Sequence, residues 1–411
     1  MTVDRSPANS ARDISAPKDS ILFVDDEPHV LEALRNLFHR QRRRWHMVFA
    51  SSAEQALESL EQCEFDLIVS DMRMPGMDGA TLLERVKELH PAVARIVLSG
   101  HADREAVIRG VLVAHQFLAK PCDVELLVAV VERILGLRAL VPSRDIRAGL
   151  GKIDRLPRHR ESAESLEDAI SRGCTIPELD AMFSSEPALT AKLLHLVNSA
   201  FFGAEQSIVS LREALGYFGG QLHQLAIHGR AFAAPTTLVD AVAVDATVER
   251  AHLLSRIARR AAFVGVDTDL AATIALLQEA GSLALEKIYP GHIASVSEFA
   301  ADENRSIQQA ERTLLGVTHA EVGAYLLGLW GLPPCIVDVV AFHHQPALSP
   351  SVYRATTLLL QATRALADSM VGTPGGEPLD MDLLGSFGMV EHLPRWRSIV
   401  NDELCRAAIA A

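Results

Sequence analysis

The chain has 411 residues, of which 49% are hydrophobic and 22% are charged, and its formal net charge is −13. This length exceeds one ordinary hydrophobic core and predicts two or three domains. The acidic balance argues against non-specific nucleic-acid binding by the whole protein. The five cysteines are scattered and never spaced as CxxC, which indicates neither a disulfide framework nor a structural zinc site.

The N-terminal segment and the overall hydropathy bear on location. Residues 1–19 are polar and contain Pro, Ser and Asn, which predicts a disordered tail. No apolar run reaches membrane-spanning length, and the start of the chain lacks the apolar segment of a signal peptide. We therefore expect a cytoplasmic protein that does not interact with membranes.

Strands alternate with helices from residue 20 onward. The run ILFVD at 21–25 is continuously apolar and ends in acid, which is typical of a buried parallel strand. Further strands are predicted at HMVFA, FDLIVSD, ARIVLSG and HQFLAK, and helices at 28–38, 53–60, 79–89, 104–113 and 124–135. This alternation over residues 20–138 predicts an α/β fold with a five-stranded, doubly wound parallel sheet.

The strand pattern stops after residue 140. Residues 139–155 include VPSRDIRAGLGK, whose Pro, Gly and charged residues indicate a linker. Beyond it the apolar spacing is helical, as in PALTAKLLHLVNSAFF. We predict an all-α domain over residues 156–365 and a C-terminal helical extension over 366–411.

Five polar side chains fall at the ends of four predicted strands. Asp25 and Asp26 follow the first strand, Asp71 ends the third, Ser99 the fourth and Lys120 the fifth. Parallel strands bring these ends to one edge, where three carboxylates would repel one another unless a cation such as Mg²⁺ is bound. Asp26 and Asp71 would bind Mg²⁺ directly, and Asp25 directly or through water. Asp71 could then attack phosphorus to form an aspartyl phosphate, with Lys120 and Ser99 contacting the phosphoryl oxygens.

The motifs VDDEP, SDMRMPGMDG, LSGHAD and FLAKP occur in this order, and residues 20–138 resemble the receiver domain of two-component response regulators. The resemblance implies that Asp71 is phosphorylated by a sensor histidine kinase, with Mg²⁺ as cofactor and with self-phosphorylation and dephosphorylation. It also implies metal binding by Asp25, Asp26 and the Arg73 carbonyl, a switch pair of Ser99 and Phe117, phosphate contact by Lys120, and a cis bond before Pro121.

Three stretches of the helical half resemble the HDOD domain, a relative of the HD metal-dependent phosphohydrolases. They are residues 186–203, 207–219 and 316–344, within a resemblance that covers roughly 150–365. These motifs imply a fold more than a chemistry.

The stretch LLQEAG stands where the catalytic relatives have a His-Asp pair. Gln278 replaces the histidine and Glu279 the aspartate, and Gln is a poor metal ligand. His252, upstream, fits the family helix only with a shift of one or two residues. We therefore expect a degenerate site, with no stoichiometric transition metal and with Gln278 and Glu279 hydrogen-bonded to neighbouring helices.

Three histidines of the family pattern remain: His319, His343 and His344. They are a possible residual ligand site and could bind a metal by themselves. The alternative is a structural role in capping, in the core or at an interface.

These features predict a response regulator whose receiver controls a non-catalytic HDOD domain that binds an unknown downstream protein or small ligand. A homodimer is compatible with the sequence. Direct DNA binding is not expected, because no basic helix-turn-helix is found. One alternative is an enzyme, a metal-dependent phosphohydrolase such as a cyclic-dinucleotide phosphodiesterase. Another is a phosphate sink that drains a kinase, with the HDOD part as a scaffold.

Overall fold

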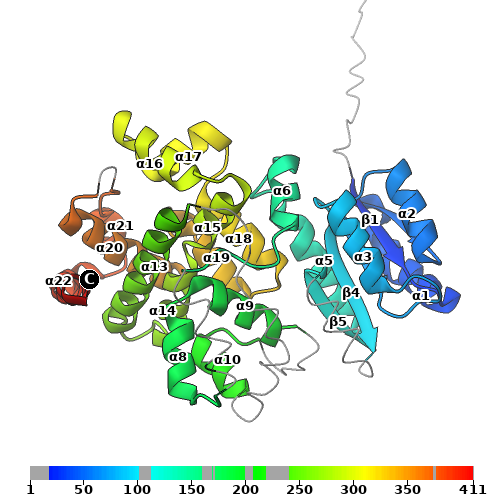
Figure 1. The fold of residues 1–411 in the computed structure, drawn as a ribbon, viewed down its shortest axis with the longest axis horizontal. Coiled ribbons are helices and arrows are strands. Elements are labelled where there is room, and N and C mark those ends of the chain that lie inside the picture. The colour runs from blue at the N-terminus through cyan, green and yellow to red at the C-terminus, as the bar shows by residue number, and fades with distance from the viewer. Residues whose placement is uncertain are drawn as a thin grey trace, which may run out of the picture.

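The structure is a computed structural model. It describes residues 18–100, 113–159, 169, 172–199, 207–218, 240–373 and 376–410, with the backbone alone at 99, 100, 218 and 410. Figure 1 shows a parallel sheet with its helices on one side of the molecule and a helical assembly on the other. The C-terminal helix lies at the end of the molecule farthest from the sheet.

The sheet confirms the predicted α/β architecture. Its strands are β1 (Asp19–Val24), β2 (Trp45–Ala50), β3 (Leu67–Asp71), β4 (Ala94–Gly100) and β5 (Gln116–Lys120). All pairs are parallel, in the order β2-β1-β3-β4-β5. Residues 21–23 of β1 are fully buried, as an apolar strand covered on both faces requires.

Local sequence signals explain where the helices of the sheet region begin. They are α1 (Pro28–Leu37), α2 (Ala53–Gln62), α3 (Gly79–Leu89) and α5 (Val124–Leu137), with the short 3-10 helix η1 (Phe38–Arg43). Pro28 occupies the first turn of α1, and the side chains of Ser52, Asp78 and Asp123 cap α2, α3 and α5. The helix predicted at 104–113 lies almost wholly outside the described residues.

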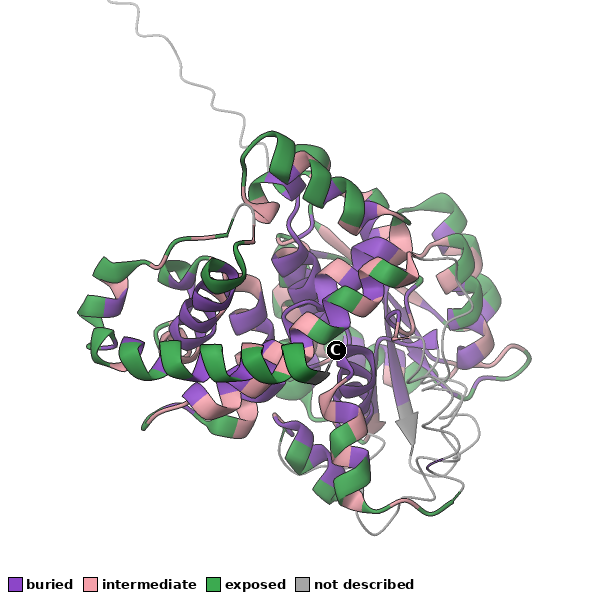
Figure 2. Cartoon of the chain, turned by 60° about the vertical axis from the view of Figure 1, so that its left-hand side comes forward, coloured by how far each residue is buried: buried purple, intermediate pink, exposed green. Residues whose placement is uncertain are grey.

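The remainder of the described chain is helical, as predicted. Its helices are α6 (Arg144–Gly151), α8 (Ile176–Ser184), α9 (Pro187–Val197), α10 (Leu211–Phe218), α13 (Ala241–Ala261), α14 (Thr268–Leu277), α15 (Ala280–Ile288), α16 (His292–Asp302), α17 (Ile307–Leu315), α18 (His319–Leu329), α19 (Pro334–Phe342), α20 (Arg354–Val371), α21 (Met381–Ser386) and α22 (Leu393–Ala410), with 3-10 turns η2 (Pro346–Leu348) and η3 (Val390–His392). Figure 2 shows buried residues concentrated in the central helices and in the sheet. Within the described ranges, no helix is both long and apolar enough to cross a membrane.

The C-terminal extension packs onto the helical domain. α20 runs without a break across residue 365, where we predicted the boundary. Helices α13, α20 and α22 share a second hydrophobic core. At its centre Trp396 is fully buried, and its indole N–H donates to the Ala261 carbonyl at 3.0 Å.

The predicted linker contains a helix, α6, that is packed against both parts of the molecule. A Cβ on Gly151 would lie 1.8 Å from the Pro91 carbonyl oxygen, next to the sheet, and one on Gly149 would lie 2.9 Å from the side chain of Ile288 in α15. Arg95 of β4 donates to the Gly151 carbonyl at 2.7 Å. The glycines that suggested a loose linker are the points of closest approach between neighbouring elements.

The sheet edge contacts the C-terminal end of α18. The Gln116 side chain of β5 donates to the carbonyls of Gly328 and Leu329 at 3.1 and 3.2 Å. Arg133 of α5 donates to the Leu332 carbonyl at 3.0 Å. Leu137 packs so tightly on Gly328 that a Cβ there would lie 2.7 Å from it. β5 and α5 therefore form the face on which the helical domain rests.

Candidate functional sites

The first site lies at the carboxyl ends of the strands. Asp25 follows β1, Asp71 ends β3 and Lys120 ends β5. The Lys120 ammonium donates to Asp25 Oδ2 at 2.8 Å and also bonds to Asp71 Oδ1. The structure thus brings three of the predicted site residues together, because β1 and β3 are neighbours and β5 ends at the same edge.

Electrostatics at this edge favour the charged form of Lys120. Burial opposes the ammonium charge, but hydrogen bonds to Asp25 and Asp71 outweigh it and raise the Lys120 pKa. Asp25 and Asp71 are 1% and 8% exposed, whereas the Lys120 side chain is 28% exposed. The site is therefore held together internally and still opens to solvent on the lysine side.

Backbone groups fix the two carboxylates. The Glu27 amide donates to Asp25 Oδ1 at 3.0 Å, and the Arg73 amide donates to Asp71 Oδ2 at 2.7 Å. A Cβ on Gly79 would lie 2.0 Å from the Asp71 carbonyl oxygen, so only glycine lets α3 begin this close to Asp71. Sequence reasoning assigned no role to Gly79, although it ends the SDMRMPGMDG motif.

The other predicted residues of this edge are placed as follows. Asp26 is partly exposed beside Asp25. Phe117 is buried in β5 and pairs with Val97 of β4. The side chain of Ser99 lies outside the described residues. The Lys120-Pro121 bond is cis, as expected.

The second site is a cavity of about 210 Å³ inside the helical domain. Apolar side chains of α16, α17 and α20 form part of its wall. Its charged lining residues are Arg250, Glu279, Glu311, Arg364, Asp368 and Glu377. Sequence reasoning found only Glu279 among them; the available signal was a charged residue inside an otherwise apolar helix, as at Arg364.

Glu279 is buried at the break between α14 and α15 and is paired with an arginine. Arg364 of α20 donates to Glu279 Oε1 at 2.8 Å, and Ser282 donates to Oε2 at 3.2 Å. Arg250 of α13 approaches to 3.8 Å. Burial would raise the Glu279 pKa, but Arg364 and its other charged neighbours lower it. Glu279 therefore remains an anion held by two neighbouring helices.

Gln278 departs from expectation. It is 1% exposed, and its Oε1 has no hydrogen-bond partner in the described part of the chain. The prediction that neighbouring helices satisfy it is wrong for this oxygen, because Gln278 ends a helix whose residues 271–277 are all buried. His252 does not line the cavity; Arg250, two residues earlier on α13, does.

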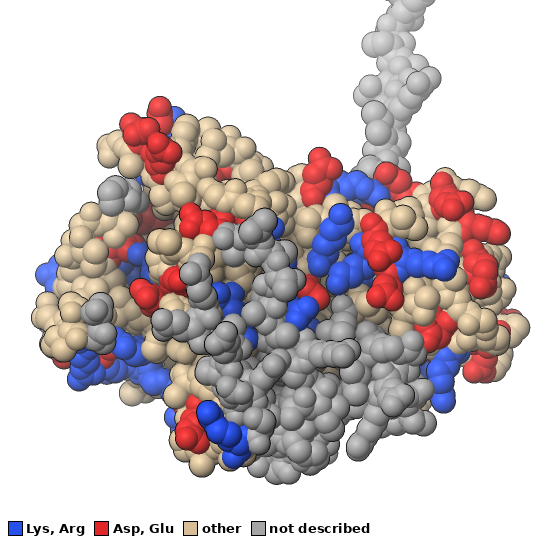
Figure 3. All heavy atoms as spheres, in the orientation of Figure 1, with Lys and Arg blue, Asp and Glu red and all other residues tan. Residues whose placement is uncertain are grey.

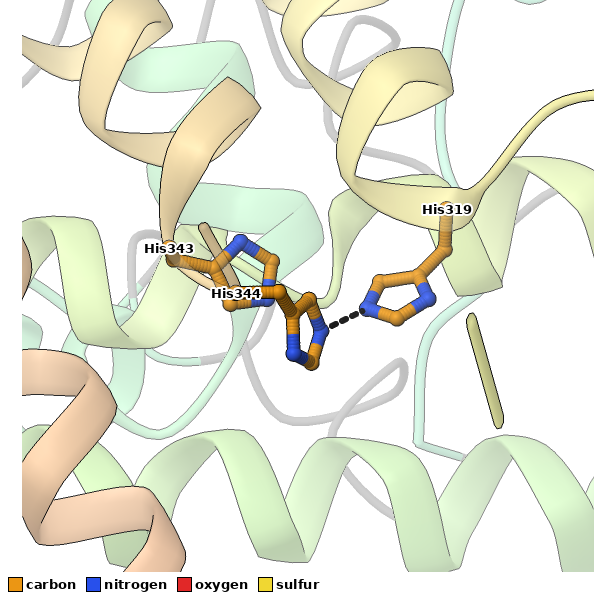
Figure 4. A group of neighbouring side chains, drawn as sticks. All are labelled: His319, His343 and His344. Carbon is orange, nitrogen blue, oxygen red and sulfur yellow. Dashed lines mark hydrogen bonds between the residues drawn. The ribbon is translucent and has the colours of Figure 1, made fainter. Parts of the chain in front are cut away.

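The three histidines lie close together (Figure 4), and His319 and His344 line the cavity. His319 begins α18, and His343 and His344 follow α19. The ring nitrogens Nε2 of His319 and His344 lie 2.9 Å apart, and one ring nitrogen of each histidine lies within 4.8 Å of the others. A Cβ on Gly281 would lie 1.8 Å from the His319 carbonyl oxygen. This glycine therefore lets α15, which follows Glu279, approach α18 closely.

The Nδ1 atom of each histidine contacts an oxygen. His319 Nδ1 lies 2.8 Å from Glu311, His344 Nδ1 lies 2.8 Å from Glu377, and His343 Nδ1 lies 2.7 Å from the Val340 carbonyl.

The same neighbours set the protonation of the histidines. Burial would lower the pKa of His319, but Glu311 raises it. Burial opposes the charge of Glu311, but His319 lowers its pKa to about 2. Burial and the Arg364 guanidinium lower the pKa of His343 to about 3.

Residues 21–132 match the response regulator receiver domain family, and residues 156–346 match the HDOD domain family. Among curated proteins, the hydrogenase transcriptional regulatory protein HoxA of Cupriavidus necator is 36% identical over 110 residues, which is 26% of this chain and 22% of the relative. The DNA-binding transcriptional regulator NtrC of Escherichia coli is 40% identical over 88 residues, which is 21% of this chain and 19% of the relative. The chain thus spans less than a quarter of the length of these relatives.

Solved structures similar to parts of the chain include the signal receiver domain of an HD domain-containing protein from Pseudomonas fluorescens. It is 30% identical and covers 30% of this chain and 98% of that one, with a TM-score of 0.29. The MmoQ response regulator from Methylococcus capsulatus is 21% identical and covers 59% of this chain and 98% of that one, with a TM-score of 0.45.

Proposed function

Since the chain joins a response regulator receiver domain to an HDOD domain, we propose that it is a response regulator whose phosphorylation at Asp71 controls a non-catalytic HDOD output domain. The observation that carries this proposal is the Lys120 ammonium bonded to both Asp25 and Asp71 at the strand ends. The phosphodonor is a sensor histidine kinase, and the location is cytoplasmic.

The chemistry at Asp71 is transfer of a phosphoryl group from a phosphohistidine. The Asp71 carboxylate oxygen forms a bond to phosphorus while the phosphorus–nitrogen bond of the donor breaks, and the donor imidazole leaves. The Arg73 amide holds one Asp71 oxygen at 2.7 Å. Lys120 then neutralises charge on the phosphoryl oxygens, and the Ser99 hydroxyl donates a hydrogen bond to them.

The residues of this edge fit a magnesium ion, since carboxylate and carbonyl oxygens are the ligands that Mg²⁺ takes. Asp25, Asp26, Asp71 and the Arg73 carbonyl would hold it. When bound, the ion supplies positive charge against the phosphoryl oxygens.

The HDOD domain lacks the machinery for hydrolysis in this proposal. Arg364 lies 2.8 Å from Glu279 and 3.3 Å from His343. The guanidinium thus pairs with Glu279, which stands in place of the aspartate of the catalytic pair. Together with Gln278 in place of a histidine, this arrangement favours an output domain that binds a protein or small ligand.

The route from Asp71 to the HDOD domain runs through the sheet edge. Lys120 and Phe117 share β5 with Gln116, which donates to the carbonyls at the end of α18. His319 begins the same helix. A shift of β5 or α5 on phosphorylation would therefore move α18, which begins at the cavity. We expect a coupling free energy between the two sites of about 1–3 kcal/mol.

Two assays on the full-length protein test this proposal. With a small-molecule phosphodonor and Mg²⁺, we expect one phosphoryl group per chain, none on Asp71→Asn, and unchanged labelling of the exposed control Asp145→Asn. With cyclic dinucleotides and phosphomonoesters as substrates, we expect no hydrolysis. Phosphoryl labelling of Asp71→Asn would contradict Asp71 as the acceptor. Hydrolysis of these substrates by the wild-type protein, lost in Glu279→Ala, would favour the phosphohydrolase alternative.

A further inference from the structure

The tautomers of the three histidines follow from their neighbours. A carboxylate or carbonyl oxygen can only accept, so each Nδ1 that contacts one must carry the proton. The acceptors are Glu311 for His319, Glu377 for His344 and the Val340 carbonyl for His343. Each neutral imidazole therefore presents an Nε2 lone pair.

These lone pairs point at one another. The Nε2 atoms of His319 and His344 lie 2.9 Å apart, and Figure 4 shows a nitrogen of each ring directed at the other, with His343 beside His344. Two buried acceptors at this distance repel unless a positive centre lies between or beside them. The Nε2 of His343 has only a 3.3 Å contact with Arg364, longer than the contacts made by the three Nδ1 atoms.

Charge balance favours a divalent ion over a single proton. The described residues that line the cavity include two arginines and four carboxylates, so the negative charges exceed the arginine charges by two when all four carboxyls are ionised and the histidines are neutral. A proton shared by His319 and His344 would offset one of these charges, whereas a divalent cation offsets both. Buried net charge of this kind is costly.

We propose that His319, His343 and His344 bind one divalent transition-metal ion through their Nε2 atoms. Imidazole ligands suit zinc and its neighbours in the first transition row. In metal sites, a histidine that binds the ion through one ring nitrogen usually donates its other N–H to a carboxylate or a carbonyl, and this hydrogen bond orients the ring. Of the two roles that the sequence leaves open for these residues, the geometry favours metal binding, contrary to the expectation that the domain carries no stoichiometric transition metal. The ion would tie the start of α18 to the end of α19, and it requires neither phosphorylation of Asp71 nor hydrolysis.

Metal content of the full-length protein tests this site. After treatment with a chelator, reloading with Zn²⁺ and dialysis, we expect about one zinc per chain. With Co²⁺ as a spectroscopic probe, we expect visible absorption bands of nitrogen-coordinated cobalt. Because both measurements use the wild-type chain, they do not depend on the folding of any variant.

Variants then assign the ligands. His319→Gln and His344→Gln should each weaken zinc binding at least about tenfold, and the exposed control His39→Gln should not. Asp71→Asn should retain the metal, so failure of the phosphorylation proposal and failure of this one give different results. Wild-type protein without bound zinc, or a zinc affinity of His319→Gln and His344→Gln unchanged from that of the wild type, would overturn the proposal.

Discussion

The receiver edge and the HDOD cavity both hold carboxylates against basic side chains, but they differ in access. At the receiver edge, Lys120 bonds to two carboxylates and keeps 28% of its side chain exposed. In the cavity, the Arg364 side chain is 11% exposed and the Glu279 side chain 5%. In the proposed function, a phosphoryl group on Asp71 would take over contacts of Lys120, whereas Arg364 stays paired with the buried Glu279.

Many charged side chains of the receiver lie on its surface. Acidic and basic side chains are interspersed over the receiver on the face shown in Figure 3. The charged residues Arg250, Glu279 and Arg364 of the HDOD domain instead line a cavity. The comparison therefore predicts that charge changes at the receiver affect chemistry first, and that charge changes in the cavity affect folding first.

The largest expected effect is on the buried pair. Arg364→Met leaves Glu279 buried without its main partner, so we expect the free energy of unfolding to fall by about 3–5 kcal/mol. The control Arg212→Met removes a 70% exposed partner of Asp269 and should cost about 1 kcal/mol or less. Urea unfolding measures both free energies. Similar losses for the two variants would contradict the claim that the buried pair contributes more to stability than the exposed one.

Removal of a buried cation that has no ion-paired carboxylate among the described residues should instead raise the free energy of unfolding. Lys192 is 2% exposed, with Nζ 3.5 Å from His195 and 5.9 Å from the Trp330 ring. Burial lowers its pKa from 10.5 to about 8. The unfolded chain therefore binds the proton more tightly, so this destabilisation is complete below pH 8 and disappears as pH rises from about 8 to 10.5.

Lys192→Met should remove that penalty. We expect a gain of up to about 3 kcal/mol at pH 7 and almost no gain above pH 10.5. Free energies of unfolding of the wild type and of Lys192→Met, measured from pH 7 to above pH 10.5, test this expectation. A gain that does not depend on pH would mean that packing, not ionisation, sets the effect.

The smallest expected effect concerns helix approach at the cavity. Gly281→Ala places a methyl group 1.8 Å from the His319 carbonyl oxygen, and we expect a loss of about 1–3 kcal/mol as α15 moves away from α18. Gly216 of α10 has open space at the same position, so Gly216→Ala should be neutral or gain about 0.5–1 kcal/mol. Equal effects in thermal unfolding would contradict the close crossing.

The two sites also differ in how far sequence could predict them. The receiver edge was foreseeable because parallel strands carry Asp25, Asp71 and Lys120 to one edge whatever the loop details. In the cavity, Arg250, Arg364, Glu311 and Glu377 come from separate segments with no shared motif. Only three-dimensional packing pairs them with Glu279 and the histidines.

The helical linker was missed for a related reason. Its glycines suggested flexibility, whereas they allow close contact with Pro91 and Ile288. Ile146 and Leu150, spaced by four residues and buried, were the available helical signal.

Hydrogen exchange on the full-length protein, with and without a phosphodonor, tests most directly whether the receiver acts on the HDOD domain through α18. We predict altered exchange in β5, α5 and α18, including Gly328 and Leu329, and no change in Asp71→Asn. Altered exchange confined to the loops around Asp71, with α18 unaffected in the phosphorylated protein, would contradict the account.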